Sequence, residues 1–303
     1  MPPAIARASH VFIAGLPRTG STLTHRILNR SPEVRLAGET HFMGARTPFG
    51  RRSGYADRFA GAGELQTDAG LERVVTAVYA SRGKSFWSRF ASTIERKEFE
   101  RLLRDSDRSR RALFDAAMRA FAQGRPVAGD KTPEHIDAVP TLLAWFPEAR
   151  VVHTFRDPRA IYVSLRRKER AESLSAVGRL ARRAGPLFDL YASTSLALRW
   201  RSMARRHRRY AAAYPDRYLL QRFEDLLADP EAAVRRLCQF IGIAFDPAML
   251  DQVVHNSSYV PKKSGAGIDQ STAQRWRDHL PRTTGRWLAL LCGRELATFG
   301  YEP

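Results

Sequence analysis

The stretch GLPRTGST, residues 15–22, constrains this chain more than any other. It follows the apolar run HVFIAG (10–15), which predicts a buried strand, and it precedes STLTHRILNRS (21–31), which has helical spacing. A glycine-rich turn between a buried strand and a helix lets backbone N–H groups surround an anion, and the helix start adds partial positive charge. The sequence therefore predicts an anion-binding loop on an α/β scaffold.

The loop departs at one position from the triphosphate-binding pattern G-x-x-x-x-G-K-[ST]. Ser21 stands where that pattern has its lysine, and Arg18 lies inside the loop. The site therefore suits an anion that needs less neutralisation than a triphosphate with its metal. A structural glycine turn without a ligand is the alternative that the loop alone leaves open.

The remaining apolar runs alternate with helical spacing, as in a parallel sheet covered by helices on both faces. Helices are predicted near 71–80, 95–104, 109–122, 230–241 and 283–298, and further strands at 34–38, within 126–136, at 149–155 and at 217–223. We expect one α/β domain over residues 1–303, with a P-loop-like, three-layer fold around a parallel sheet of about five strands. A helical insertion is expected at about 42–125.

A second candidate binding element is RVVHTFRDPRAIYVSLRRK (150–168). The predicted strand ends at Arg156, Pro158 suits the first turn of a helix, and Ser164 follows eight residues after the arginine. Ligands of open α/β folds bind at the carboxyl edge of the sheet, so Arg156 and Ser164 are placed to hold a second phosphate. A salt bridge is the alternative for Arg156 taken alone.

The chain is strongly basic, with 50 Lys and Arg against 31 Asp and Glu and a net charge of +19. Only six of the 50 are lysine, a skew that arginine codons in a GC-rich genome produce. The part of the charge that codon usage does not explain would still create a positive electrostatic field that concentrates anionic ligands. The basic stretches 165–183 and 199–210 are either solvated helix faces or a surface for an acidic acceptor, a membrane or nucleic acid, and both interpretations stay open.

Cysteine content and hydropathy bear on the compartment. Cys238 and Cys292 lie in apolar helical patterns without partners at metal-ligand spacing, which predicts buried, reduced thiols. The sequence has no apolar run of about 18 residues and no signal-peptide pattern at its start. We therefore expect a soluble, cytoplasmic protein without a transmembrane segment.

In their order along the chain, these motifs resemble the sulfotransferases that use 3′-phosphoadenosine 5′-phosphosulfate (PAPS), especially the tyrosylprotein branch and its bacterial relatives. The likeness spans nearly the whole chain, apart from about 42–125. The motifs that carry it are PRTGST, EVRLAGET (33–40), DKTP (130–133), RDPRAIYVS (156–164), RFEDLLADPEAAVRRLCQFIGI (222–243) and LATFGYEP (296–303).

The resemblance implies a nucleotide site. The loop would bind the 5′-phosphosulfate, with Arg18 replacing the missing lysine, and Arg156 and Ser164 match the pair that grips the 3′-phosphate. Lys168 matches a further phosphate ligand. The segment 256–276 resembles a loop that closes over the nucleotide, in which Arg275 takes a basic position and Ser257 is a weaker match. The loop residues implied in binding are Arg18, Thr19, Gly20, Ser21 and Thr22.

The resemblance also implies a catalytic set. Glu39, in AGETHF, stands at the position of the catalytic glutamate and would act as the base. Lys131, in GDKTP, matches the lysine that neutralises the leaving phosphate oxygen, and Arg18 adds positive charge. His41 is the substitute base, because other branches use a histidine. A capping or ion-pairing role for Glu39 and a surface turn for Lys131 are the alternatives.

Three departures keep the acceptor open. Phe223, in RFEDL, stands where the tyrosylprotein pattern has a tyrosine, and His41 stands where that branch has an arginine that orients the peptide. Animal members of that branch are membrane proteins, whereas this chain shows no anchor. The acceptor is therefore a hydroxyl on a small molecule, a tyrosine, a lipid or a sugar, and the positive field suits an acidic one.

We predict metal-independent transfer of a sulfuryl group to that hydroxyl, with release of adenosine 3′,5′-bisphosphate (PAP). We expect no nucleic-acid partner, and a homodimer stays open. Two alternatives come from other classes of protein: a P-loop kinase that uses ATP and Mg²⁺, and a basic nucleic-acid-binding protein with a degenerate loop.

Overall fold

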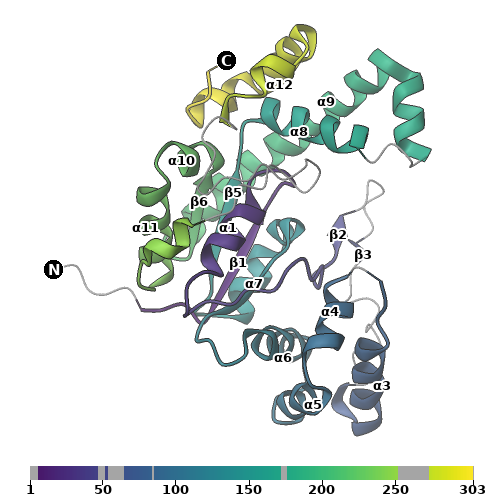
Figure 1. The fold of residues 1–303 in the computed structure, drawn as a ribbon, viewed down its shortest axis with the longest axis vertical. Helices are drawn as coiled ribbons and strands as arrows, with labels where there is room; N and C mark the ends of the chain where they lie inside the picture. The colour runs from purple at the N-terminus through teal and green to yellow at the C-terminus, as the bar shows by residue number, and fades with distance from the viewer. Residues whose placement is uncertain are drawn as a thin grey trace, which may run out of the picture.

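The computed structural model describes residues 6–46, 52–53, 65–83, 85–171, 176–251 and 273–302. Its centre is a sheet in the spatial order β4-β1-β5-β6, with all neighbouring strands parallel. Helices lie on both sides of this sheet (Figure 1). The predicted three-layer α/β fold is thus confirmed. The strands are β1 (His10–Gly15), β4 (Ala128–Lys131), β5 (Arg150–Phe155) and β6 (Tyr218–Arg222).

The described sheet has four strands, where we expected about five. Segment 34–38 runs beside β4 but makes only two isolated parallel bridges, Val34 to Val127 and Ala37 to Asp130. Between these bridges the backbone of Leu36 contacts the first helix and its cap: its carbonyl lies 2.9 Å from His25 Nε2, and its N–H donates to Oδ1 of Asn29, the residue that follows the helix (2.7 Å). The segment is therefore fastened to that helix as well as to β4, and it leads directly to Glu39.

Alternate side chains of β1 enter two separate cores. Val11 and Ile13 pack in one core with buried side chains from three of the helices whose bounds follow, the first after β1 and the two after β6, whereas Phe12 and Ala14 pack on the opposite face. The helices that bury these faces, with the short elements between them, are α1 (Ser21–Leu28), α3 (Asp68–Tyr79), α4 (Phe86–Thr93), α5 (Arg96–Arg104), α6 (Arg110–Ala122), η2 (Pro133–Ala138), α7 (Val139–Trp145), α8 (Pro158–Ala171), α9 (Ala176–Ala213), α10 (Phe223–Ala228), α11 (Pro230–Ile241), η3 (Pro247–Leu250), η5 (Arg277–His279) and α12 (Arg282–Thr298).

The helices predicted near 71–80, 95–104 and 109–122 are confirmed as α3, α5 and α6, and α4 lies between α3 and α5 in the chain. A two-stranded pair, β2 (Ala45–Arg46) and β3 (Arg52–Ser53), lies nearby in the chain. Trp87 of α4 is fully buried, and its indole N–H donates to the carbonyl of Thr40 (3.1 Å). The insertion is thus tied to the residue that follows Glu39.

The C-terminal helices predicted at 230–241 and 283–298 are confirmed as α11 and α12. Both cysteines are buried free thiols, as expected, and burial raises the pKa of Cys238 to about 11 and that of Cys292 to about 12. Among the described residues, no helix is both long and apolar enough to cross a membrane.

Stability should fall in mild acid because His153 is buried in β5. Desolvation, with His207 and Arg206 nearby, lowers the pKa of His153 from 6.5 to about 3. The folded state therefore keeps this ring neutral while the unfolded chain takes up a proton below about pH 6.5. We expect the free energy of unfolding to drop by about 2 kcal/mol from this group alone between pH 7 and pH 5.

Urea unfolding of His153→Gln at both pH values should show a loss smaller by that amount. The matched variant His279→Gln removes an exposed histidine and should keep the full wild-type loss. An identical loss in wild type and His153→Gln would contradict the assignment.

Candidate functional site

Parallel pairing brings three chain segments to one edge of the sheet. Ile13 is in register with Lys131, and Gly15 is in register with Thr154. The loop after β1, the end of β4 and Arg156 directly after β5 therefore meet at the carboxyl edge, as the sequence predicted for a ligand site.

The loop itself depends on glycine at position 20. Gly20 has φ 90°, and a Cβ there would lie 2.4 Å from Cδ2 of Phe223. Both the left-handed backbone and the lack of space exclude a side chain. α1 begins immediately afterwards, with the N–H of Thr24 donating to the carbonyl of Gly20 (3.0 Å). The turn and the helix start thus form the expected cradle.

Arg18, which the sequence assigned to the 5′-phosphosulfate, contacts both residues that it assigned to the 3′-phosphate. Its Nε donates to Ser164 Oγ (2.9 Å), and its carbonyl accepts from Arg156 Nη1 (3.2 Å). Arg156 is buried beneath this loop, and its guanidinium lies 4.2 Å from the ring centroid of Phe223. Phe223, which stands where the tyrosylprotein pattern has a tyrosine, thus makes a cation–π contact with Arg156 and packs against Gly20.

Arg156 stays charged despite its burial. Desolvation lowers its pKa to about 10, and the nearby Glu224 carboxylate acts in the opposite direction. Glu224 accepts from the N–H of Asp157 (3.1 Å) and from the hydroxyl of Tyr301 (2.9 Å), so it belongs to the same arrangement. Burial raises the pKa of Glu224 above its usual range.

The other predicted nucleotide residues lie at different distances from this centre. The hydroxyl of Thr19 donates to the carbonyl of Leu16 (2.7 Å), so we expect its backbone rather than its side chain to contact an anion. Ser21 is buried, whereas Thr22 is exposed. Lys168 is half-buried on α8, one turn after Ser164. Arg275 lines a cleft together with Glu224 and Leu227. Ser257 falls outside the described residues.

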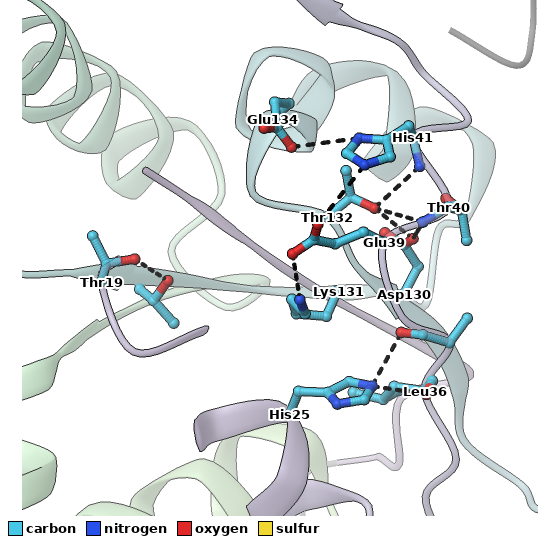
Figure 2. A network of polar contacts seen from close by, with 12 residues as sticks. Thr19, His25, Leu36, Glu39, Thr40, His41, Asp130, Lys131, Thr132 and Glu134 are labelled. Atoms are coloured by element: carbon cyan, nitrogen blue, oxygen red, sulfur yellow. Dashed lines mark hydrogen bonds and ion pairs between the residues drawn. The ribbon is translucent and has the colours of Figure 1, made fainter. Parts of the chain in front are cut away.

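Glu39 and Lys131 meet, as Figure 2 shows. The Lys131 Nζ lies 2.6 Å from Glu39 Oε1. The lysine side chain is 8% exposed and the glutamate side chain 46%, so Lys131 is not a surface lysine and Glu39 faces outward from it. His41 Nε2 lies 3.8 Å from Glu39 Oε2, and its Nδ1 lies 3.7 Å from Glu134 Oε2. Both candidate bases therefore occupy one small region.

A buried polar network holds this region in place, and sequence reasoning missed it. Asp130 is fully buried; its Oδ2 accepts from the N–H of Thr40 (3.2 Å) and from the hydroxyl of Thr132 (2.8 Å). Its Oδ1 lies 2.8 Å from His135 Nδ1. Because His135 Nε2 accepts from the N–H of Met43 (3.2 Å), the ring proton sits on Nδ1, facing Asp130.

This network keeps Asp130 ionised. Burial would raise the pKa of Asp130, but His135 and the bonds from Thr40 and Thr132 together hold it below its usual range. In the sequence, the only signal that could have indicated this network is the spacing of Asp130 and His135 within DKTPEH. The network fixes the backbone of the loop that carries Glu39 to the strand end that carries Lys131.

The site thus gathers Arg18, Lys131 and Arg156 around a glycine loop, with a carboxylate at its side, an arrangement for a polyanion that undergoes proton-coupled chemistry. The sequence model of the sulfotransferase family matches residues 10–247. The chain belongs to the sulfotransferase family. This match runs through the helical insertion, for which the motifs alone offered no counterpart, and it confirms the resemblance inferred from them.

The relatives of this chain are named for different acceptors. It is 31% identical to human carbohydrate sulfotransferase 6 in an alignment that covers 51% of this chain and 42% of that protein. It is 24% identical to the protein-tyrosine sulfotransferase 2 of Gallus gallus in an alignment that covers 97% of this chain and 69% of the other. The chain spans about two fifths of the length of the carbohydrate sulfotransferases it matches.

Solved structures share the fold of this sulfotransferase. The sulfotransferase domain of the Synechococcus PCC 7002 olefin synthase superimposes with a TM-score of 0.58 at 22% identity, covering 100% of this chain and 98% of that one. The sulfotransferase domain from the curacin biosynthetic pathway gives a TM-score of 0.55 at 18% identity, with coverage of 98% and 99%.

Proposed function

We propose that this sulfotransferase moves a sulfuryl group from PAPS to the hydroxyl of an acceptor and releases PAP. The observation that carries the proposal is the 2.6 Å contact between Lys131 and Glu39 at the sheet edge beside the Arg18 loop. This contact supports the proposal because it pairs a cation that can serve the leaving group with a carboxylate that can serve as the base for the acceptor. Small molecules, peptide tyrosines, lipids and sugars are the acceptor classes we retain.

The described residues fit the nucleotide co-substrate. The Gly20 turn, which has no room for a Cβ beside the Phe223 ring, leads directly into a helix start that favours anions. Arg18 is expected to bind the phosphosulfate, and Arg156 with Ser164 the 3′-phosphate. Three arginine and lysine charges then oppose the charge of the ligand without a metal ion.

The reaction we propose is an in-line displacement. The acceptor oxygen forms a bond to sulfur while the bond from sulfur to the 5′-phosphate oxygen breaks, and that oxygen leaves with the electron pair as part of PAP. Glu39 takes the acceptor proton. We assign to Lys131 and Arg18 the stabilisation of the negative charge that grows on the leaving oxygen and the sulfuryl oxygens.

Turnover should persist in excess chelator. The transferred group carries less negative charge than a γ-phosphate, and Arg18 with Lys131 supplies positive charge directly. The assay follows label from PAPS into a panel of hydroxyl compounds, with and without EDTA. Loss of turnover on chelation that Mg²⁺ restores, or tighter binding of ATP than of PAP, would favour the kinase instead.

Arg156→Ala should weaken PAP binding by about 1.5 to 3 kcal/mol, the range for losing a charge-assisted hydrogen bond. Affinity for adenosine 5′-phosphosulfate, which lacks the 3′-phosphate, should barely change. Titration calorimetry with both ligands measures the difference. Because Arg156 also donates to the Arg18 carbonyl, equal losses for both ligands would show that it supports the loop rather than the 3′-phosphate.

A further inference from the structure

Helices α9 and α12 expose large apolar side chains on their outer side. Leu187, Tyr191 and Leu198 of α9 are 75%, 67% and 56% exposed, and Leu290 of α12 is 74% exposed. Residues 4, 7 and 11 positions apart lie on one side of a helix, so the three α9 side chains form one stripe. Figure 1 shows α12 and the part of α9 nearest to it at the end of the molecule opposite α3 and α5, with the rest of α9 running toward β6.

The exposed side chains of the two helices border the same contact. The indole N–H of Trp287 donates to Thr194 Oγ1 (2.8 Å), which joins α12 to α9. Around the helix axes, Leu198 lies about 40° from Thr194 and Leu290 about 60° from Trp287, in each case away from the buried side. The stripe and Leu290 therefore lie on one surface, on the solvent side of the helix pair.

Exposed arginines extend this surface, and its acidic neighbours are already paired. Asp189 lies 2.9 Å from Arg166, and Glu295 Oε1 accepts from Arg201 (3.2 Å). In the described part of both helices these are the only carboxylates. The exposed arginines lie 7 and 11 positions after Leu198 and one turn before and after Leu290; they are Arg205, Arg209, Arg286 and Arg294.

We propose that this surface, the α9–α12 face, docks the protein on a membrane that carries anionic lipid headgroups. Its members are Leu187, Tyr191, Leu198, Leu290 and the four arginines Arg205, Arg209, Arg286 and Arg294. Leucine and tyrosine side chains would enter the headgroup boundary while the arginines bind lipid phosphates. A second copy fits less well, because it would set these cations against each other on a chain of net charge +19.

The experiment is cosedimentation with vesicles and does not depend on sulfuryl transfer. Vesicles of phosphatidylcholine with about 30 mol% phosphatidylglycerol should bind the full chain in about 0.1 M salt, and vesicles of phosphatidylcholine alone should bind it at least tenfold more weakly. Salt near 0.5 M should release the charge-dependent part. Equal binding to both vesicle types would overturn the proposal.

Two variants separate the apolar and cationic contributions. One is a double variant, Tyr191→Ser with Leu198→Ser, and the other a triple variant, Arg205→Gln with Arg209→Gln and Arg294→Gln. Each should weaken vesicle binding at least tenfold. For the triple variant, each arginine is expected to contribute roughly fivefold. All five residues are exposed, so the fold should persist. The matched control removes three arginines elsewhere: Arg101→Gln, Arg110→Gln and Arg235→Gln.

The control triple variant should bind vesicles as wild type does. Equal losses in both triple variants would show that only total charge matters and would overturn the assignment to this face. Sedimentation velocity provides the other decisive outcome. A dimer that the Tyr191→Ser, Leu198→Ser variant dissociates would identify the occupant as a second copy.

Discussion

Lys131→Met is expected to lower kcat by about 10²- to 10³-fold while the protein stays folded. Methionine keeps the apolar stem of a side chain that is only 8% exposed, but it removes the cation that we assign to the leaving oxygen. Losing one preoriented donor that acts mainly in the transition state has an effect of this size. Single-turnover transfer from labelled PAPS measures it, because product release then does not limit the rate.

Lys97→Met is the matched control, since Lys97 is exposed on α5. It should turn over at the wild-type rate. PAP affinity of Lys131→Met should change far less than its kcat, because Arg18 and Arg156 retain the nucleotide. Near-normal turnover of Lys131→Met would remove this residue from the mechanism and leave its contact with Glu39 a structural one.

The sequence was sufficient to predict the edge of the sheet at which the site lies. Apolar runs at 10–15 and 149–155 identify buried strands by composition alone, and parallel strands place the segments that follow them side by side. The sequence alone therefore predicts that the loop at 15–22 and Arg156 lie in one region. Segment 34–38 shows the limit, because its apolar content did not reveal that it would form isolated bridges rather than a full strand.

The contacts inside the site could not be predicted in the same way. Arg18 bonds to Ser164 across 146 positions, and Lys131 bonds to Glu39 across 92. No periodicity links residues so far apart, so only the resemblance to a family suggests the roles of Glu39 and Lys131. The side-chain environment of Asp130, fully buried against His135, was equally inaccessible, because burial of a carboxylate depends on partners from several segments.

The candidate base, Glu39, lies open to solvent on one side. Glu39 is not enclosed: its side chain is 46% exposed and contacts Lys131 on one side, with His41 3.8 Å away on the other. The Glu39 side chain must therefore be oriented by the backbone of the next residue, Thr40. The N–H of Thr40 donates to Asp130, and its carbonyl accepts from Trp87. Because backbone contacts position Glu39, removing its charge should leave the protein folded. The activity of a Glu39 variant therefore tests the chemistry and not the fold.

Glu39→Gln is expected to reduce the rate of transfer by about 10²- to 10⁴-fold while PAP affinity survives. Glutamine keeps the size of the side chain and much of its hydrogen bonding but cannot take the acceptor proton, and losing general-base help has an effect of this size. The loss should shrink for acceptor hydroxyls of lower pKa, because they need less help in giving up the proton. A series of substituted phenols in single-turnover assays measures this dependence.

His41→Ala is the decisive comparison, since His41 is the other base within reach. If Glu39 is the base, His41→Ala should lose much less activity than Glu39→Gln, and its loss should not vary with acceptor pKa. The opposite pattern, near-normal turnover of Glu39→Gln and abolished turnover of folded, PAP-binding His41→Ala, would transfer the role to the histidine. Combining Glu39→Gln with Lys131→Met should cost less than the sum of the two separate losses, because the side chains act together across a 2.6 Å contact.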